Sequence, residues 1–194
     1  MKTIDYYNKH AEEFTASTFE VDMESLYKPF LAELQEGARI LDVGCGSGRD
    51  TLAFKNKVYH VDAIDYSEEL IKKATELTGI QVHHTSFYDL ADSDKYDGVW
   101  ACASLLHCER DKLLDVLHRI HRALRCTGIC YMSFKYGTMD RVKDGRAFTD
   151  LDEEQAQVLL AQLDGVAVIK QWITVDKRPD RDEQWLNVLW KKHV

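Results

Sequence analysis

The chain has 194 residues, of which 45% are hydrophobic and 30% charged, and its formal net charge is -8. This length suits one domain with its own core. The acidic balance argues against a nucleic-acid partner, and no apolar stretch approaches the roughly 20 residues of a membrane span. The N-terminal segment has neither an apolar run nor an Arg-rich composition, so we expect a cytoplasmic protein without a targeting peptide.

Five cysteines stand within or beside apolar segments, at positions 45, 102, 108, 126 and 130. No two of them have the C-x-x-C spacing of zinc or thioredoxin-type sites. His118 and His121 share a helical face without a third ligand, and His83 and His84 alternate along a strand, so neither pair is arranged to hold one ion. We therefore expect reduced, packed thiols and no metal.

Short β-like runs alternate with helical patterns along most of the chain. Apolar runs predict strands at 39–43, 58–64, 80–85, 96–101 and 129–134. The spacing of apolar residues predicts helices at 23–35, 51–57, 109–124 and 152–163. Ser67 can cap one more helix, with Glu68 in its first turn. Strands separated by helices imply right-handed crossovers and a parallel sheet.

The end of the chain has a different pattern. Two β-like runs, 166–175 and 184–190, are joined by the charged turn KRPDRD. This turn is too short for a crossover helix, so the two strands are predicted to be antiparallel. The predicted fold is α/β: a Rossmann-like open sheet that is mostly parallel, with an antiparallel C-terminal hairpin and helices on both faces.

The most specific local feature follows the first predicted strand, where a loop with Gly44, Gly46 and Gly48 comes directly after Asp42-Val43 and before a helix. In open α/β sheets, ligands bind at the carboxyl ends of strands, and glycines let the backbone approach them. Asp65 ends the next strand, where an acid accepts hydrogen bonds from ribose hydroxyls. Loop and acid together predict an adenosine-type cofactor; a tight strand–helix turn without a ligand is the alternative for the glycines alone.

Two departures narrow the cofactor class. A dinucleotide fingerprint needs its third glycine at position 49, which is Arg49, and no G-x-x-x-x-G-K-[ST] phosphate loop occurs. Asp42, directly before the loop, repels a pyrophosphate but attracts a cation. S-adenosylmethionine carries both a sulfonium cation and an adenosine, so it is the cofactor that we expect.

The segments ILDVGCGSGRDTLAF and HVDAIDYS resemble the cofactor signature of class I S-adenosylmethionine-dependent methyltransferases, and the resemblance extends over nearly the whole chain. It implies a single methyltransferase domain over 1–194, with an N-terminal helical cap at 1–36 and a Rossmann-like core at 37–194. SFKYG, DGRAF and RPDRDEQWLNVLWKK are more narrowly similar to short bacterial methyltransferases grouped with the tellurite-resistance methyltransferase TehB.

The resemblance also implies a cofactor site. The loop backbone would meet the methionine end, Asp42 would anchor the loop or the amino group, and Asp65 would hold the ribose. Tyr66 would lie along the adenine, although the aspartate that the family commonly carries near Ser86 is here Asp89. The implied cofactor-binding residues are Tyr7, Asp42, Gly44, Cys45, Gly46, Asp65, Tyr66, Ser86, Phe87, Ala101 and Cys102.

Candidates for the acceptor side follow the fourth and fifth strands. His107 is an acceptor contact or a base, or else it packs a loop. A basic loop with Arg141 and Lys143 suggests an anionic acceptor, although incidental surface charge is the alternative. Arg178 joins this site if the KRPDRD turn folds over it. The predicted catalytic and acceptor-side residues are His107, Lys135, Tyr136 and Arg146.

The predicted function is in-line transfer of a methyl group to a small anionic or soft nucleophilic molecule, in which alignment and water exclusion carry much of the rate. A general base is needed only if the acceptor holds its proton. Three alternatives stay open: a nicotinamide-dependent oxidoreductase, a non-catalytic cofactor-binding partner subunit, and an enzyme whose acceptor is RNA, bound through the basic loop with a strong salt dependence.

Overall fold

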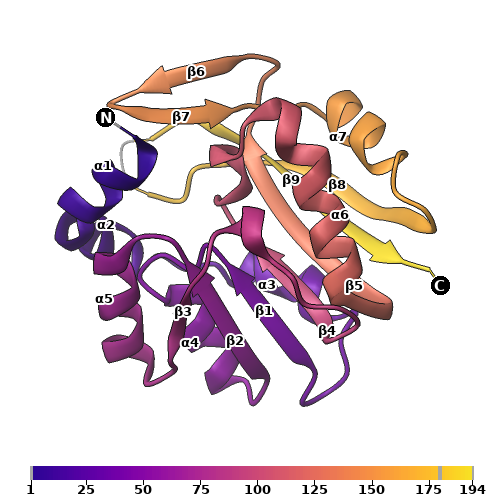
Figure 1. The fold of residues 1–194 in the computed structure, drawn as a ribbon, viewed down its shortest axis with the longest axis horizontal. Coiled ribbons are helices and arrows are strands. Elements are labelled where there is room, and N and C mark those ends of the chain that lie inside the picture. The colour runs from indigo at the N-terminus through magenta and orange to yellow at the C-terminus, as the bar shows by residue number, and fades with distance from the viewer. Residues whose placement is uncertain (1, 179–180, 194) are drawn as a thin grey trace.

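The computed structural model describes residues 2–178 and 181–193. A seven-stranded sheet has the order β3-β2-β1-β4-β5-β9-β8 (Figure 1). Its parallel strands are β1 (Arg39–Val43), β2 (His60–Asp65), β3 (Val82–His84), β4 (Tyr96–Ala101) and β5 (Leu124–Lys135). β9 (Gln184–Lys192) runs antiparallel to both β5 and β8 (Val166–Val175). The predicted fold class is confirmed.

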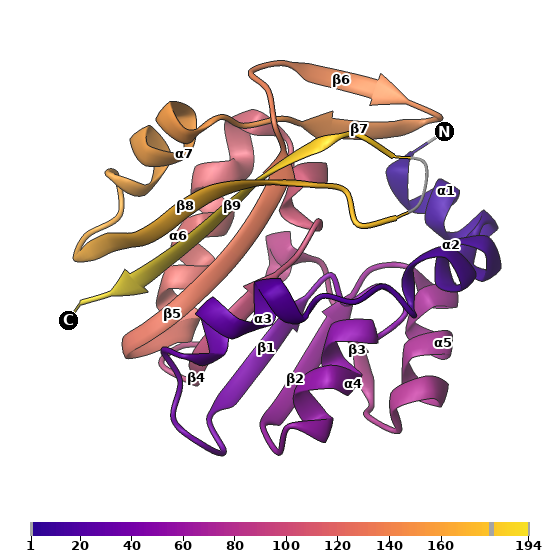
Figure 2. The ribbon, with the colours of Figure 1, turned by 180° about the vertical axis from the view of Figure 1, so that it is seen from behind.

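Helices cover both faces of the sheet (Figures 1 and 2). The alternation of side chains along β1 shows how: Ile40 packs in one cluster with Phe30 and Phe54, whereas Leu41 packs in another with Leu117. The first face carries α3 (Glu24–Leu31), α4 (Arg49–Asn56) and α5 (Glu68–Thr78), and the second carries α6 (Leu113–Ala123) and α7 (Glu153–Leu160). Ser67 caps α5 by accepting from the Leu70 N–H, as predicted.

Several element boundaries differ from the prediction, most of all at β5, at the helix before it and in the N-terminal segment. β5 begins at Leu124, five residues early, because α6 ends at Ala123 and the chain extends at once. The predicted helix over 109–124 is therefore shorter, with a turn of 3-10 helix over Arg110–Lys112 ahead of it. The N-terminal segment forms two helices, α1 (Thr3–Lys9) and α2 (Ala11–Thr18), which pack beside α5 (Figure 1).

The basic loop is a hairpin, which corrects the prediction of a loop. β6 (Asp140–Lys143) and β7 (Arg146–Thr149) pair antiparallel, and α1 contacts β7. The hairpin turns at Asp144 and Gly145, with φ of 53° and 77°. Asp-Gly with two positive φ values is the preferred two-residue hairpin turn. The dipeptide was thus a readable signal.

Two further predictions concern a membrane span and the KRPDRD turn. None of the helices in the described ranges is long and apolar enough to cross a membrane. The tip of the predicted KRPDRD turn, residues 179–180, lies outside the described residues, whereas Arg178 and Arg181 lie within them.

Candidate active site

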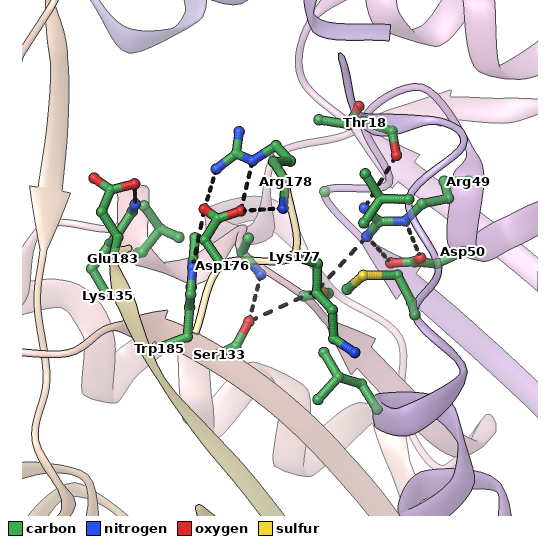
Figure 3. A pocket seen from close by; sticks show the side chains of 18 of the residues that line it. Thr18, Arg49, Asp50, Ser133, Lys135, Asp176, Lys177, Arg178, Glu183 and Trp185 are labelled. Carbon is green, nitrogen blue, oxygen red and sulfur yellow. Dashed lines mark hydrogen bonds and ion pairs between the residues drawn. The ribbon is translucent and has the colours of Figure 1, made fainter. Parts of the chain in front are cut away.

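A pocket opens where β1, β4 and β5 end, next to the two N-terminal helices and the β6–β7 hairpin. Figure 3 shows some of the side chains that line it. Gly44 lines it from the loop after β1, Cys102 from the end of β4, and Ser133 from β5. Phe14 of α2 and Arg146 of β7 close it from the other side. This is the crevice at the carboxyl ends of strands where open α/β sheets bind ligands.

Backbone N–H groups of the glycine loop donate hydrogen bonds within the chain. Gly44 and Cys45 both donate to the Ile64 carbonyl, at 2.9 and 3.0 Å, and Gly46 donates to the Asp65 carboxylate at 2.8 Å. A phosphate-binding loop instead points free N–H groups at its ligand. This loop can therefore offer carbonyl oxygens and close contact, which suit an ammonium group better than a pyrophosphate.

Two of the glycines are required by close approach. A Cβ on Gly44 would lie 2.5 Å from the Ser104 Cβ, and one on Gly46 would lie 3.1 Å from the ring of Phe14. Both residues have a positive φ, 69° and 58°, which L side chains adopt only at a cost. The loop thus packs directly against the segment after β4 and against α2 of the cap.

Asp65 organises the loop from the end of β2. Its carboxylate accepts three backbone N–H groups, those of Gly46, Tyr66 and Ser67, each at 2.8 Å. Burial raises the pKa of Asp65, and the three amides oppose that shift. A carboxylate has about four acceptor positions, so capacity is left for a single ribose hydroxyl rather than for both.

Asp42 lies behind the loop instead of facing the pocket. It is buried, and its Oδ2 accepts from the Thr51 hydroxyl at 2.6 Å. Burial and the neighbouring Asp50 carboxylate raise the pKa of Asp42. Of the two roles that the resemblance implied, this geometry fits the anchoring of the loop to α4 and not contact with an amino group.

The other predicted cofactor residues divide into two groups. Tyr7, Gly44, Cys45, Gly46 and Cys102 line the pocket. Tyr66 is exposed, and its ring lies 5.1 Å from that of His84, while the Ser86 hydroxyl accepts from the Tyr88 N–H. The pocket lining does not include Asp42, Asp65, Tyr66, Ser86, Phe87 or Ala101. The residues that the resemblance implies for the adenine, Tyr66, Ser86 and Phe87, therefore lie outside the pocket.

His107 is held between the cap and the hairpin. Its Nδ1 lies 2.7 Å from the Ala147 carbonyl, which accepts, so Nδ1 carries the proton and Nε2 accepts from the Tyr7 hydroxyl at 2.8 Å. Burial lowers the pKa of His107 to about 4, so the ring is neutral at pH 7. Both nitrogens are engaged, and this arrangement makes His107 a link rather than a free base.

The side of the pocket that was predicted to bind the acceptor is strongly basic. Lys135 is buried, forms an ion pair with Glu183 and lies 4.5 Å over the Trp185 ring. The Arg146 guanidinium lies 4.1 Å over the Tyr6 ring, and its buried Nε has no hydrogen-bond partner in the described part of the chain. Tyr136, by contrast, is exposed and does not line the pocket, which leaves the prediction of a catalytic role for it without support.

The charge of the lining is opposite to that of the chain. Among the described lining residues, the acids are Asp50, Asp176 and Glu183. The cations are Arg49, Lys135, Arg141, Lys143, Arg146, Lys177, Arg178 and Arg181. One carboxylate, that of Glu183, faces three cations: Lys135, Lys143 and Arg181, the last two at 3.8 Å each. The positive excess creates a local field that attracts anions.

The sequence did not reveal the buried network around Asp50. Its carboxylate accepts from Arg49, from the Tyr27 hydroxyl at 2.6 Å and from Trp100 Nε1 at 2.8 Å. The Trp100 ring stacks on Tyr131 with centroids 4.0 Å apart. These residues come from α3, α4, β4 and β5, so no local spacing could have grouped them.

The chain is similar in sequence to known methyltransferases. A family model for the methyltransferase domain matches residues 40–128. An uncharacterized methyltransferase of Staphylococcus carnosus is 26% identical over 135 residues, 66% of this chain and 65% of that protein. (S)-coclaurine N-methyltransferase of Papaver somniferum is 26% identical over 94% of this chain and 57% of its own length. The chain thus spans less than two thirds of either relative.

A solved structure extends the likeness to the fold. The 1,6-didemethyltoxoflavin-N1-methyltransferase of Burkholderia thailandensis, solved with S-adenosylhomocysteine, has a TM-score of 0.79 at 22% identity and covers 98% of this chain and 85% of its own. The family match runs from β1 into β5 and includes the glycine loop and Asp65. Residues 40–128 therefore match the model of a methyltransferase domain, and the chain shares the fold of this methyltransferase.

Proposed function

We propose that this chain transfers a methyl group from S-adenosylmethionine to a small anionic acceptor with a soft nucleophilic atom. One observation carries the proposal: a single pocket joins the glycine loop to an excess of cations, on a chain whose net charge is -8. The narrower resemblance to the TehB methyltransferases supports only the class of acceptor, a small anion, and does not name a molecule.

The cofactor would use the loop and the end of β2. The open acceptor position of Asp65 suits a ribose hydroxyl, and the carbonyl oxygens of the loop suit the amino group of the methionine moiety. Tyr66 and Phe87 flank the adenosine end, where the surface is open. The sulfonium then faces Cys102 and the acceptor pocket.

The transfer itself is a displacement. A lone pair of the acceptor attacks the methyl carbon, the bond from that carbon to sulfur breaks, and S-adenosylhomocysteine leaves as a neutral thioether. The cap and the hairpin align the reactants and keep water out, and alignment can supply much of the rate. No proton needs to move in this step.

The side chains support an acceptor that needs no base. Asp50, Asp176 and Glu183 are each paired with a cation, and both nitrogens of His107 are engaged. Among the described lining residues, these are the acids and the histidine. An acceptor that already carries an unshared pair at neutral pH, such as a thiolate, suits this environment.

The test uses labelled S-adenosylmethionine and a cell extract separated into anionic, neutral and cationic small molecules. We expect label in the anionic fraction. Lys135→Gln and Arg146→Gln should lower the yield by about tenfold or more, because each removes a charged partner, and should leave the affinity for S-adenosylhomocysteine within about twofold. Lys28→Gln, on the exposed side of α3, is the matched control.

Three outcomes would count against the proposal. Label confined to the neutral fraction would remove the anionic acceptor. If calorimetry detects binding of NADH but no binding of S-adenosylhomocysteine, the cofactor is a nicotinamide dinucleotide and not S-adenosylmethionine. RNA binding that weakens steeply with salt and is lost in Arg146→Gln would make RNA the acceptor.

A further inference from the structure

Two pairs of facing residues on neighbouring strands form part of the floor of the pocket. Ser133 of β5 stands opposite Asn187 of β9, and Lys135 of β5 stands opposite Trp185 of β9. All four line the pocket. Alternate residues of a strand share one face of the sheet, so the two pairs lie roughly 7 Å apart along β5. The floor therefore has an inner pair, Ser133 and Asn187, and an outer pair, Lys135 and Trp185, at a fixed separation.

The inner pair lies next to the end of β4. The Ser133 hydroxyl accepts from the Ala103 N–H at 2.8 Å and lies 3.9 Å from the sulfur of Cys102, which the proposed function places beside the sulfonium. The Asn187 amide is engaged within the chain. Its Oδ1 accepts from the Tyr131 hydroxyl at 2.6 Å, and its Nδ2 donates to two groups of β8 at 3.0 and 3.1 Å. The inner pair thus presents a surface without charge to the acceptor.

The outer pair leads into a group of cations. Lys135 is buried and forms an ion pair with Glu183. Lys143 of the hairpin and Arg181 of the β8–β9 connection face the same carboxylate at 3.8 Å each. Figure 3 shows Lys135 and Glu183 at one end of the drawn side chains, with Ser133 nearer the middle. We call Lys135, Lys143 and Arg181 the outer cation cluster.

One carboxylate does not neutralise the outer cation cluster. Among the described residues, Glu183 is the only acid that forms an ion pair with any of its members, so two positive charges are left over. Exposed ion pairs add little to stability, so the fold alone does not account for three cations at one acid. Burial lowers the pKa of Lys135, and Glu183 offsets this only in part. A second anion beside Glu183 would compensate the excess.

We infer that the outer cation cluster binds a carboxylate of the acceptor that is separate from the nucleophilic atom. The acceptor is then a chain with a soft nucleophile at one end and a carboxylate at the other, roughly 7 Å apart and joined by an apolar spacer. The spacer would lie against Trp185, and Leu106 and Phe148 add apolar surface to the lining. This inference rests on the proposed function, because it specifies the acceptor of that reaction.

Two product analogues test this separation. In (methylthio)acetate the sulfur and the carboxylate are attached to one carbon, whereas in extended 5-(methylthio)pentanoate they lie about 7 Å apart, like the two pairs of the floor. Calorimetry compares each with its neutral amide on the chain saturated with S-adenosylhomocysteine. The longer carboxylate should bind about tenfold or more tightly than its amide. This preference should be smaller by about threefold or more for the shorter pair, because its carboxylate stops short of the cluster.

Two variants with opposite expected effects keep the test decisive. Lys143→Gln removes an exposed cation of the cluster and should lower the preference for the longer carboxylate by about threefold or more. Glu183→Gln removes the internal counter-charge and should raise this preference by a similar factor. A merely structural role of the cluster would move both variants in the same direction. Lys28→Gln, exposed on α3, is the matched control and should keep the wild-type preference.

The outcomes separate this inference from the proposed function. Equal preferences for the longer and the shorter carboxylate would overturn the separate anion subsite, and so would a shift in the same direction in Lys143→Gln and Glu183→Gln. If the wild-type chain binds S-adenosylhomocysteine but none of the analogues, this inference is wrong and the proposed cofactor stands. If it does not bind S-adenosylhomocysteine, the proposed function and this inference are wrong together.

Discussion

The two halves of the pocket are built by different means. In the half proposed to bind the cofactor, here called the cofactor half, backbone N–H groups of Gly44, Cys45 and Gly46 donate to Ile64 and Asp65 at the end of the neighbouring strand. In the half proposed to bind the acceptor, here called the acceptor half, side chains from distant segments pair with one another, as in Glu183 with Lys135 and with Lys143.

This difference explains which half of the pocket can be recognised from the sequence. A loop whose backbone must turn and approach closely restricts its residues to glycine and small types, and these leave a motif. An ion pair between distant segments restricts only the charge at each end and leaves no spacing to find. The difference also predicts that damage to the first half should remove the cofactor, whereas damage to the second should spare it.

The largest expected effect breaks the cofactor half. Asp65→Ala removes the acceptor of three backbone amides, those of Gly46, Tyr66 and Ser67, and the proposed ribose contact. The binding free energy of S-adenosylhomocysteine should therefore weaken by roughly 1.5–3 kcal/mol or more. Calorimetry measures it, with Asp115→Ala, on the exposed side of α6, as the matched control. Equal affinities in the two variants would contradict the placement of the cofactor beside β2.

The next effect tests His107, which joins the halves. A ring with a pKa of about 4 in the folded chain and about 6.5 when unfolded is favoured while neutral, so its contribution is complete above pH 6.5 and is lost as pH falls toward 4. Between pH 7 and 5 the loss should reach about 2 kcal/mol.

Urea unfolding at several pH values measures this loss. Wild type should lose stability over this range more steeply than His107→Gln, which has no titrating ring. His118→Gln, on the exposed side of α6, should keep the wild-type profile. Parallel profiles for wild type and His107→Gln would show that the ring is not buried in its neutral form.

A smaller effect separates the cap from the core. Tyr7→Phe keeps the ring contacts with Phe14 and His107 but removes the hydroxyl that donates to Nε2. Loss of one such bond costs about 1 kcal/mol, so affinity for S-adenosylhomocysteine should weaken by about fivefold. Hydrogen exchange over residues 3–18 should quicken, while exchange in β1 stays slow. Unchanged exchange in the cap would refute the link.

The smallest effect lies outside both halves. Val58 follows α4 with a φ of 68°, and the Tyr59 N–H bonds to the Phe54 carbonyl as in a helix-terminating motif that favours glycine. Val58→Gly should relieve the strain and stabilise the fold by about 0.5–1 kcal/mol. A higher melting temperature with unchanged affinity for S-adenosylhomocysteine is expected; a lower one would contradict this account.

Much of the core was predictable because hydrophobic periodicity and crossover rules are local. The strands 39–43, 96–101 and 166–175 agree with β1, β4 and β8. The β6–β7 hairpin was missed although Asp144-Gly145 signals such a turn, because its strands are short and mostly exposed. Tyr136 and Lys135 were both predicted to belong to the site because both follow the fifth predicted strand. Consecutive residues of an extended chain point to opposite sides, however, so only Lys135 lines the pocket.

The sequence by itself determined the order of strands and helices, the glycine loop and the acid at the end of β2, since each depends on residues close together in the chain. The tertiary structure decided the state of every other group in the site. It engaged both nitrogens of His107, turned Asp42 away from the pocket and paired Arg49 with Asp50. The reason is physical: burial, pairing and charge compensation depend on neighbours that only the packing of distant segments provides.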